Sequence, residues 1–144
     1  NYEHRRQWIQ DRIQFLAGQF GVDVLGFAVM SNHLHVVVRN RPDVVRGWSD
    51  DDVARRWWNL FPKHRDDDGN PKDPTDFELL MITADPARLA EIRQRLSSVS
   101  WFMRCLVEPI ARSDVNATQR GVDWQMKIDD ARTKLKSVYP TIKL

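Results

Sequence analysis

Two histidines separated by one apolar residue, His33-Leu34-His35, are the side chains of this sequence best suited to chemistry. In a β-strand, alternate side chains lie on the same face with Cα atoms about 7 Å apart, so both imidazoles can reach one metal ion. A divalent ion such as Mg²⁺ or Mn²⁺ could polarise a phosphodiester there, once a third ligand completes the site. The same spacing also fits two ordinary strand residues packed beneath a helix.

The residues around this pair predict a β-hairpin. Residues 22–30 are rich in β-branched and apolar side chains, and residues 33–39 form a second run of the same kind. Ser31-Asn32, between the two runs, is a plausible tight turn because Asn tolerates positive φ. Alternation then places both histidines on one face of the second strand and Leu34, Val36 and Val38 on the other.

Helical patterns are expected on both sides of the hairpin. Apolar residues at positions 9, 13, 16 and 20 form one stripe, which predicts a helix from Tyr2 to Phe20. Ser49 and Asp85-Pro86 are helix-start signals. A buried helix over 98–108 is expected to stop at Pro109. The proline-rich run 62–74 predicts a loop, and one more helix is predicted over 129–138.

Composition limits the possible function classes. The chain has 144 residues, with 22 Lys and Arg against 20 Asp and Glu, and a net charge of +2 indicates no bulk affinity for polyanions. Nucleic-acid binding would therefore depend on a local site. The single cysteine, Cys105, excludes an intramolecular disulfide and a multi-cysteine zinc site. No apolar run has the roughly 18 residues of a membrane span, so we expect a soluble protein with no membrane partner. The single cysteine suggests a reducing compartment, so the expected location is the cytoplasm. We expect either a monomer or a homodimer.

The block from Gly26 to Val38, GFAVMSNHLHVVV, resembles the HUH strand of the REP-associated tyrosine transposases. These belong to the superfamily of single-tyrosine HUH transposases, which act on single-stranded DNA. The family commonly has a strand ending in Met-Ser/Pro-Asn-His-hydrophobic-His, followed by valines. Residues 100–112 also resemble the helix that follows the family's central helices, so the resemblance covers roughly residues 2–112.

This resemblance implies an α+β fold, in which a ferredoxin-like antiparallel sheet carries the HUH strand and helices pack on one face. It implies that His33 and His35 bind Mg²⁺ or Mn²⁺ at the scissile phosphate of single-stranded or hairpin DNA. In relatives, a tyrosine on a later helix then attacks the phosphorus and forms a 5′-phosphotyrosine. Such a weak nucleophile needs the metal and its neighbours to stabilise the developing charge.

The sequence departs from the family in its C-terminal part. The Tyr-x-x-x-Asn-Pro motif that carries the nucleophile is absent, and the only tyrosines are Tyr2 and Tyr139. Tyr139 could act as nucleophile if the tail folds back over the histidines, or it could be a packing residue. Asp114 could supply a third metal ligand, or it could serve a turn. We predict an HUH transposase-like domain over 1–112 without its first strand, and a C-terminal tail over 113–144 containing a helix.

Several cationic and aromatic side chains are candidates for DNA binding. Arginine forks match phosphate oxygens, so the arginines of the first helix and those after the histidine strand could line a groove, or they could be solvated charges. Trp58 could stack on a base, whereas Trp57 is assigned to the core. The predicted DNA-binding residues are Arg5, Arg6, Arg12, Arg39, Arg41, Arg46 and Trp58.

These observations favour a transposase-related DNA-binding domain whose enzymatic activity is uncertain without the tyrosine motif. Two alternatives remain open. One is a noncatalytic DNA-binding remnant, in which the sheet and the arginines persist without chemistry. The other is an unrelated metal-dependent hydrolase that uses His33 and His35.

Overall fold

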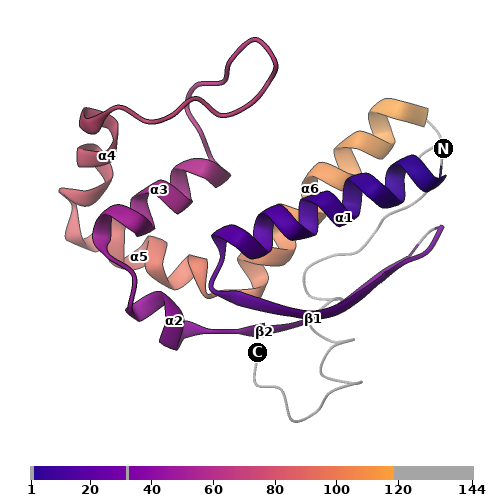
Figure 1. The fold of residues 1–144 in the computed structure, drawn as a ribbon, viewed down its shortest axis with the longest axis horizontal. Helices are drawn as coiled ribbons and strands as arrows, with labels where there is room; N and C mark the ends of the chain where they lie inside the picture. Colours follow the sequence, from indigo (N-terminus) through magenta and orange to yellow (C-terminus); the bar gives the residue numbers. More distant parts are fainter. Residues whose placement is uncertain (1, 32, 119–144) are drawn as a thin grey trace.

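The computed structural model describes residues 2–31 and 33–118, with side chains described over 3–31 and 33–112. These residues form a mixed α+β fold of six helices and one antiparallel hairpin (Figure 1). The elements in chain order are α1 (Tyr2–Gln19), β1 (Val22–Val29), β2 (Leu34–Asn40), α2 (Pro42–Arg46), α3 (Asp50–Leu60), α4 (Asp76–Thr83), α5 (Pro86–Leu96) and α6 (Val99–Thr118).

The hairpin confirms the predicted strand pairing and the predicted faces, whereas Asn32 of the predicted turn lies outside the described residues. Met30 N–H donates to the His33 carbonyl at 2.8 Å, which closes the turn between β1 and β2. Leu34, Val36 and Val38 are buried in the core that they share with α1 and α6. In Figure 1, α1 and α6 lie side by side over the hairpin. Among the described residues, helices therefore cover one face of the hairpin and none covers the other.

The ferredoxin-like sheet expected from the resemblance is not seen in the described residues. The sheet there has two strands, β1 and β2. The chain from residue 42 to residue 118 is mainly helical, and local signals explain why. Ser49 and Asp85 each accept a hydrogen bond from the third residue of the helix that they cap, at 3.1 and 3.2 Å, as predicted for α3 and α5.

Two short helices were not predicted. α4 begins with a capping box, in which the Thr75 hydroxyl accepts from Glu78 N–H and the Glu78 carboxylate accepts from Thr75 N–H. α2 begins with Pro42 at its first position, where the missing N–H costs nothing. Both signals are readable in the sequence. The loop predicted over 62–74 contains no helix or strand, apart from an isolated bridge between Arg65 and Pro71.

The backbone of Gly21, between α1 and β1, contacts the end of α5 and the residue before α2. Its N–H donates to the Leu96 carbonyl and its carbonyl accepts from Arg41 N–H, both at 2.7 Å. A Cβ atom on residue 21 would lie 2.2 Å from Cγ2 of Val45. Glycine is needed here because two backbone segments and α2 approach too closely for any side chain.

α6 corrects the prediction that the last core helix stops at Pro109. Proline has no N–H, so the carbonyl of Cys105, four residues earlier, loses its helical donor. Arg12 of α1 replaces that donor, because its Nε and Nη2 lie 3.3 and 3.1 Å from the Cys105 oxygen. The helix continues to Thr118 and crosses residue 112, where we placed the boundary between domain and tail.

The predicted helix over 129–138 lies outside the described residues. Within the described ranges, no helix is long and apolar enough to cross a membrane.

Candidate functional site

The two histidines lie side by side on the open face of the hairpin. His33 directly precedes β2 and His35 is its second residue, and both side chains are exposed. Their ring centroids are 6.0 Å apart and the ring planes are tilted by 47°. The apolar residues between and after them are buried on the opposite face. The two histidines therefore share one face of the hairpin, as predicted from strand alternation, and both imidazoles face solvent.

Small residues on β1 keep this face open. The strand register places Ala28 opposite His35 and Gly26 opposite Val37, and paired residues of antiparallel strands share a face. A β-bulge between Val24 and Gly26 leaves Leu25 as the extra, exposed residue. We did not predict a role for Ala28. The two-residue turn would have revealed it, because that turn fixes the cross-strand partner of His35.

Among the predicted DNA-binding residues, Arg5 forms a hydrogen bond with the hairpin next to the histidines. Its Nη1 donates to the carbonyl of Ser31 at 3.2 Å, two residues before His33. This contact ties the first turns of α1 to the tip of the hairpin. It also brings a permanent positive charge to the end of the hairpin that carries both imidazoles.

A third ligand is not supplied by the described side chains. No group of three or more His, Cys, Asp or Glu residues that could hold a metal ion occurs among them. Asp114 lies within α6, not in a turn after it, and its side chain is outside the described part of the chain. Tyr139 also lies outside the described residues. Two protein ligands leave most coordination positions to water or to phosphate oxygens.

Two predicted DNA-binding arginines already have carboxylate partners. Arg39 and Arg41 both bind Oδ2 of Asp23, at 2.7 and 2.9 Å, and Arg41 also pairs with Asp43. The hydrogen bonds from Arg39 and then Arg41 lower the pKa of Asp23 below its ordinary value. These arginines therefore contribute little net charge to the hairpin in this arrangement.

The predicted arginines do not form one continuous groove. Arg12 is half-buried and bound to the Cys105 carbonyl on α6, whereas Arg6 is exposed on α1 and Arg46 is exposed at the end of α2. Burial lowers the pKa of the Arg12 guanidinium, because the apolar surroundings disfavour its charge. Among the predicted arginines, Arg5 contacts the hairpin through Ser31 at its tip, and Arg39 and Arg41 contact it through Asp23 on β1.

The proposed base-stacking role of Trp58 is wrong for this structure. Trp58 is only 2% exposed, and its indole N–H donates to the Lys72 carbonyl at 2.7 Å. The loop after α3 folds back over the ring, which sequence periodicity could not reveal. Trp57 is buried in the core, as predicted.

Comparisons with models of protein families, with curated proteins and with solved structures found no match to this chain. The geometry of the open hairpin face is therefore what supports a functional assignment.

Proposed function

We propose that this chain is a DNA-binding domain related to the HUH single-tyrosine transposases, and that it uses His33 and His35 to hold a divalent metal against a phosphodiester. The observation that carries the proposal is the exposed pair of imidazoles, 6.0 Å apart on a hairpin face that small residues keep open. A structural role beneath a helix would bury these rings. Exposed side-by-side imidazoles instead suit a ligand that arrives from solvent.

The donor set fits a weakly held Mg²⁺ or Mn²⁺ ion. Each histidine can offer one ring nitrogen, and exposure leaves both side chains free to rotate toward a common ion. With two protein ligands, phosphate oxygens of bound DNA would complete the shell, so metal and DNA should bind cooperatively. When bound, the metal would supply Lewis-acid polarisation of the phosphate.

The substrate class that suits this face is single-stranded or hairpin DNA. The hairpin presents a narrow ribbon with Arg5 at its tip, which can follow one phosphate backbone. Strand cleavage through a 5′-phosphotyrosine needs a tyrosine nucleophile. The candidate, Tyr139, lies outside the described residues, so the proposal rests on binding, and cleavage is a separate outcome of the test.

Binding can be measured by fluorescence anisotropy of a labelled DNA hairpin, with Mn²⁺ or with EDTA. We expect Mn²⁺ to tighten binding at least about tenfold, a difference of about 1.4 kcal/mol. Replacing both ligands, His33→Ala with His35→Ala, should abolish this metal effect. His64→Ala is the matched control, because His64 is an exposed histidine whose partner is Glu78 on α4. Equal metal dependence in the double variant and the control would refute the proposal.

Incubating the protein with the labelled DNA hairpin and Mn²⁺ also distinguishes the chemical alternatives. A covalent protein–DNA adduct that Tyr139→Phe removes would extend the proposal to full transposase chemistry. Metal-dependent binding without an adduct is the outcome expected for a noncatalytic relative. Hydrolysis without an adduct, lost in the His33→Ala, His35→Ala variant, would replace the transposase assignment by a metal-dependent hydrolase.

A further inference from the structure

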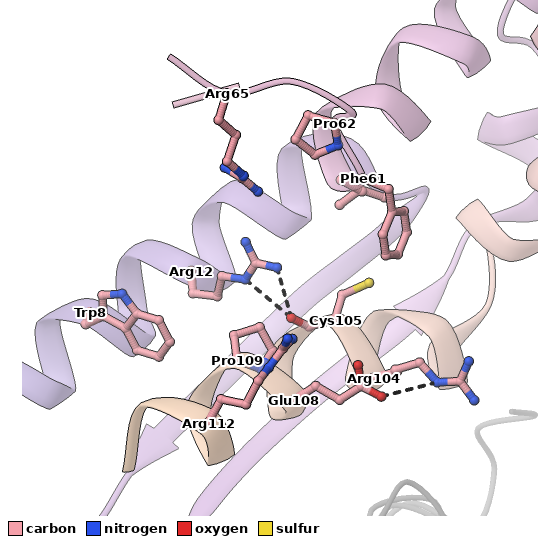
Figure 2. Close-up of a pocket in the computed structure, with 11 residues that line it drawn as sticks. Trp8, Arg12, Phe61, Pro62, Arg65, Arg104, Cys105, Glu108, Pro109 and Arg112 are labelled. Carbon is pink, nitrogen blue, oxygen red and sulfur yellow. Dashed lines mark hydrogen bonds and ion pairs between the residues drawn. The ribbon is translucent and has the colours of Figure 1, made fainter. Parts of the chain in front are cut away.

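A second candidate site lies away from the histidines, in a cavity of about 540 Å³ between α1, α6 and the segment after α3 (Figure 2). Its volume is within the usual range for small-molecule sites. Trp8 and Arg12 come from α1, Phe61 and Arg65 from the segment after α3, and Arg104 and Arg112 from α6. Among the residues described, none from β1 or β2 lines it, so the cavity is distinct from the open hairpin face.

The cavity has an excess of positive charge. Four guanidinium groups line it against one carboxylate, Glu108, and Glu108 pairs with Arg104 at 3.8 Å. Among the described side chains, Arg12, Arg65 and Arg112 have no carboxylate within ion-pair distance. After burial, which has the largest effect, the charges of Arg65 and Arg112 further lower the pKa of Arg12. Three gathered cations repel one another, and an anion between them would relieve that repulsion.

Two of these guanidiniums are held in place by main-chain carbonyls. Arg12 donates to the Cys105 carbonyl through Nε and Nη2, which leaves Nη1 for another acceptor. Arg65 donates from Nη1 to the Gly69 carbonyl at 2.8 Å, within a loop where Gly69 has a φ of +84° that favours glycine. Figure 2 shows Arg65 reaching from this loop toward Arg12. Arginines fixed in this way lose less side-chain entropy when they bind a phosphate.

Aromatic rings border the same cavity. Trp8 is 38% exposed and Phe61 is 44% exposed, so part of each ring is accessible to a ligand in the cavity. Phe61 packs against Trp57 of the core, with ring centroids 4.6 Å apart, so its position is fixed. An exposed indole next to several guanidinium groups can provide the two contacts that a nucleotide requires, one for the base and one for the phosphate.

We propose that this cavity binds one nucleotide, with its phosphate among Arg12, Arg65 and Arg112 and its base against Trp8. The nucleotide can be free, or it can be an unpaired nucleotide of a DNA strand, since both present the same phosphate and ring. The site needs no metal. It is independent of the histidine pair, so either proposal can fail without the other.

The binding test uses the whole chain in EDTA and isothermal titration calorimetry. We expect saturable binding of deoxyadenosine monophosphate that is at least about tenfold tighter than binding of deoxyadenosine or inorganic phosphate alone. A short single-stranded oligonucleotide identifies the source of the nucleotide. Preference for the mononucleotide indicates a free ligand, and preference for the oligonucleotide indicates an unpaired base of a strand. Absence of saturable binding by both probes would overturn the proposal.

Two exposed arginines provide the deciding variant. The double change Arg65→Gln with Arg112→Gln removes two cavity charges and spares Arg12, which supports α6. We expect it to weaken binding of the preferred probe at least about tenfold. Arg88→Gln is the control, because Arg88 is exposed on α5 and does not line the cavity. Equal affinity in the double variant and in Arg88→Gln would place the ligand elsewhere and refute the site.

Discussion

Arg12 donates two hydrogen bonds to the main-chain carbonyl of Cys105, a residue 93 positions away in the chain (Figure 2). Pro109 leaves this carbonyl without its helical donor, and the guanidinium takes the place of the missing N–H. One contact therefore lets a proline remain inside α6, joins α6 to α1 and fixes a cation at the edge of the arginine-lined cavity.

Removing the Arg12 side chain should destabilise the protein, and restoring the N–H at position 109 should reduce that loss. We expect Arg12→Met to lower the free energy of unfolding by about 1–3 kcal/mol, the usual cost of a buried acceptor without a partner. In a Pro109→Ala background the cost should fall by about 1 kcal/mol. Urea unfolding of the four proteins of this cycle measures the coupling. Arg88→Met, on the exposed side of α5, should show no coupling to Pro109→Ala.

The contact between Arg12 and the Cys105 carbonyl also shows a limit of prediction from sequence. Pro109 is a strong helix-breaking signal, and the donor that compensates for it lies on another helix, so no local pattern could predict that α6 continues. Trp58 is a similar case, because the loop that covers it contributes the Lys72 carbonyl from 14 positions away. The arginine-lined cavity was missed for the same reason. Its cations are spread from Arg12 to Arg112 and meet only when α1 packs on α6.

Local features were more predictable. The exposed face of His33 and His35 follows from strand alternation and a short turn, and both depend on neighbouring residues alone. The caps of α3 and α5 are equally local. The capping box of Thr75 and Glu78 gave the same kind of signal for α4, and it was overlooked beside the proline-rich loop. The ferredoxin-like sheet was expected from resemblance, not from strand patterns in residues 42–112, and these residues form no such sheet.

Cys105 should be nearly unreactive in the folded protein. Burial is the main reason that the pKa of its thiol is raised to about 11. Against the ordinary value of 9.0, the thiolate fraction at mildly alkaline pH falls about 100-fold, and alkylation by iodoacetamide should slow at least as much relative to the urea-unfolded chain.

The raised pKa of Cys105 also predicts a pH dependence of stability. Its contribution is fully present below the unfolded pKa of 9.0, and it is lost as the pH rises toward the folded pKa of about 11. Urea unfolding of wild type and Cys105→Ala between these pH values measures it, because the variant lacks this titration. Alkylation of the native protein as fast as the unfolded chain would show that the thiol is accessible and ionised, contrary to its buried position.

Asp23 should restrain DNA binding by neutralising Arg39 and Arg41. Asp23→Asn frees the guanidinium of Arg39 for phosphate, whereas Arg41 keeps its second partner, Asp43. We therefore expect tighter binding of a DNA hairpin and a slope of log K against log salt that is steeper by roughly one unit. Asp67→Asn changes the net charge equally in an exposed loop and serves as the control. If both variants tighten binding by the same factor, net charge explains the effect and the freed Arg39 does not contact DNA.

The same ion pairs should make the stability of the hairpin depend weakly on pH in acid. Arg39 and Arg41 lower the pKa of Asp23, so the stabilisation that they provide is present above its ordinary value of 3.8 and is lost as the pH falls through the lower, folded value. The effect should be small, because the side chains of both arginines and the carboxylate are between 33% and 55% exposed. Acid titrations of wild type and Asp23→Asn, followed by the NMR signals of β1 and β2, measure it. A titration midpoint of Asp23 above its ordinary value would contradict these ion pairs.

Ala28 should control access to the histidine pair. It lies directly opposite His35, and cross-strand Cβ atoms on one face are about 4.5–5.5 Å apart, so a large ring at this position would cover the imidazole. We expect Ala28→Phe to weaken Mn²⁺-dependent binding of a DNA hairpin at least about tenfold, while the thermal unfolding midpoint changes little. Paramagnetic Mn²⁺ should broaden the imidazole NMR signals of His33 and His35 in wild type and much less in this variant. Leu25→Phe adds a ring at the exposed bulge of the same strand and should leave binding intact. DNA affinity that survives Ala28→Phe unchanged would mean that the strand is bound by another surface of the protein.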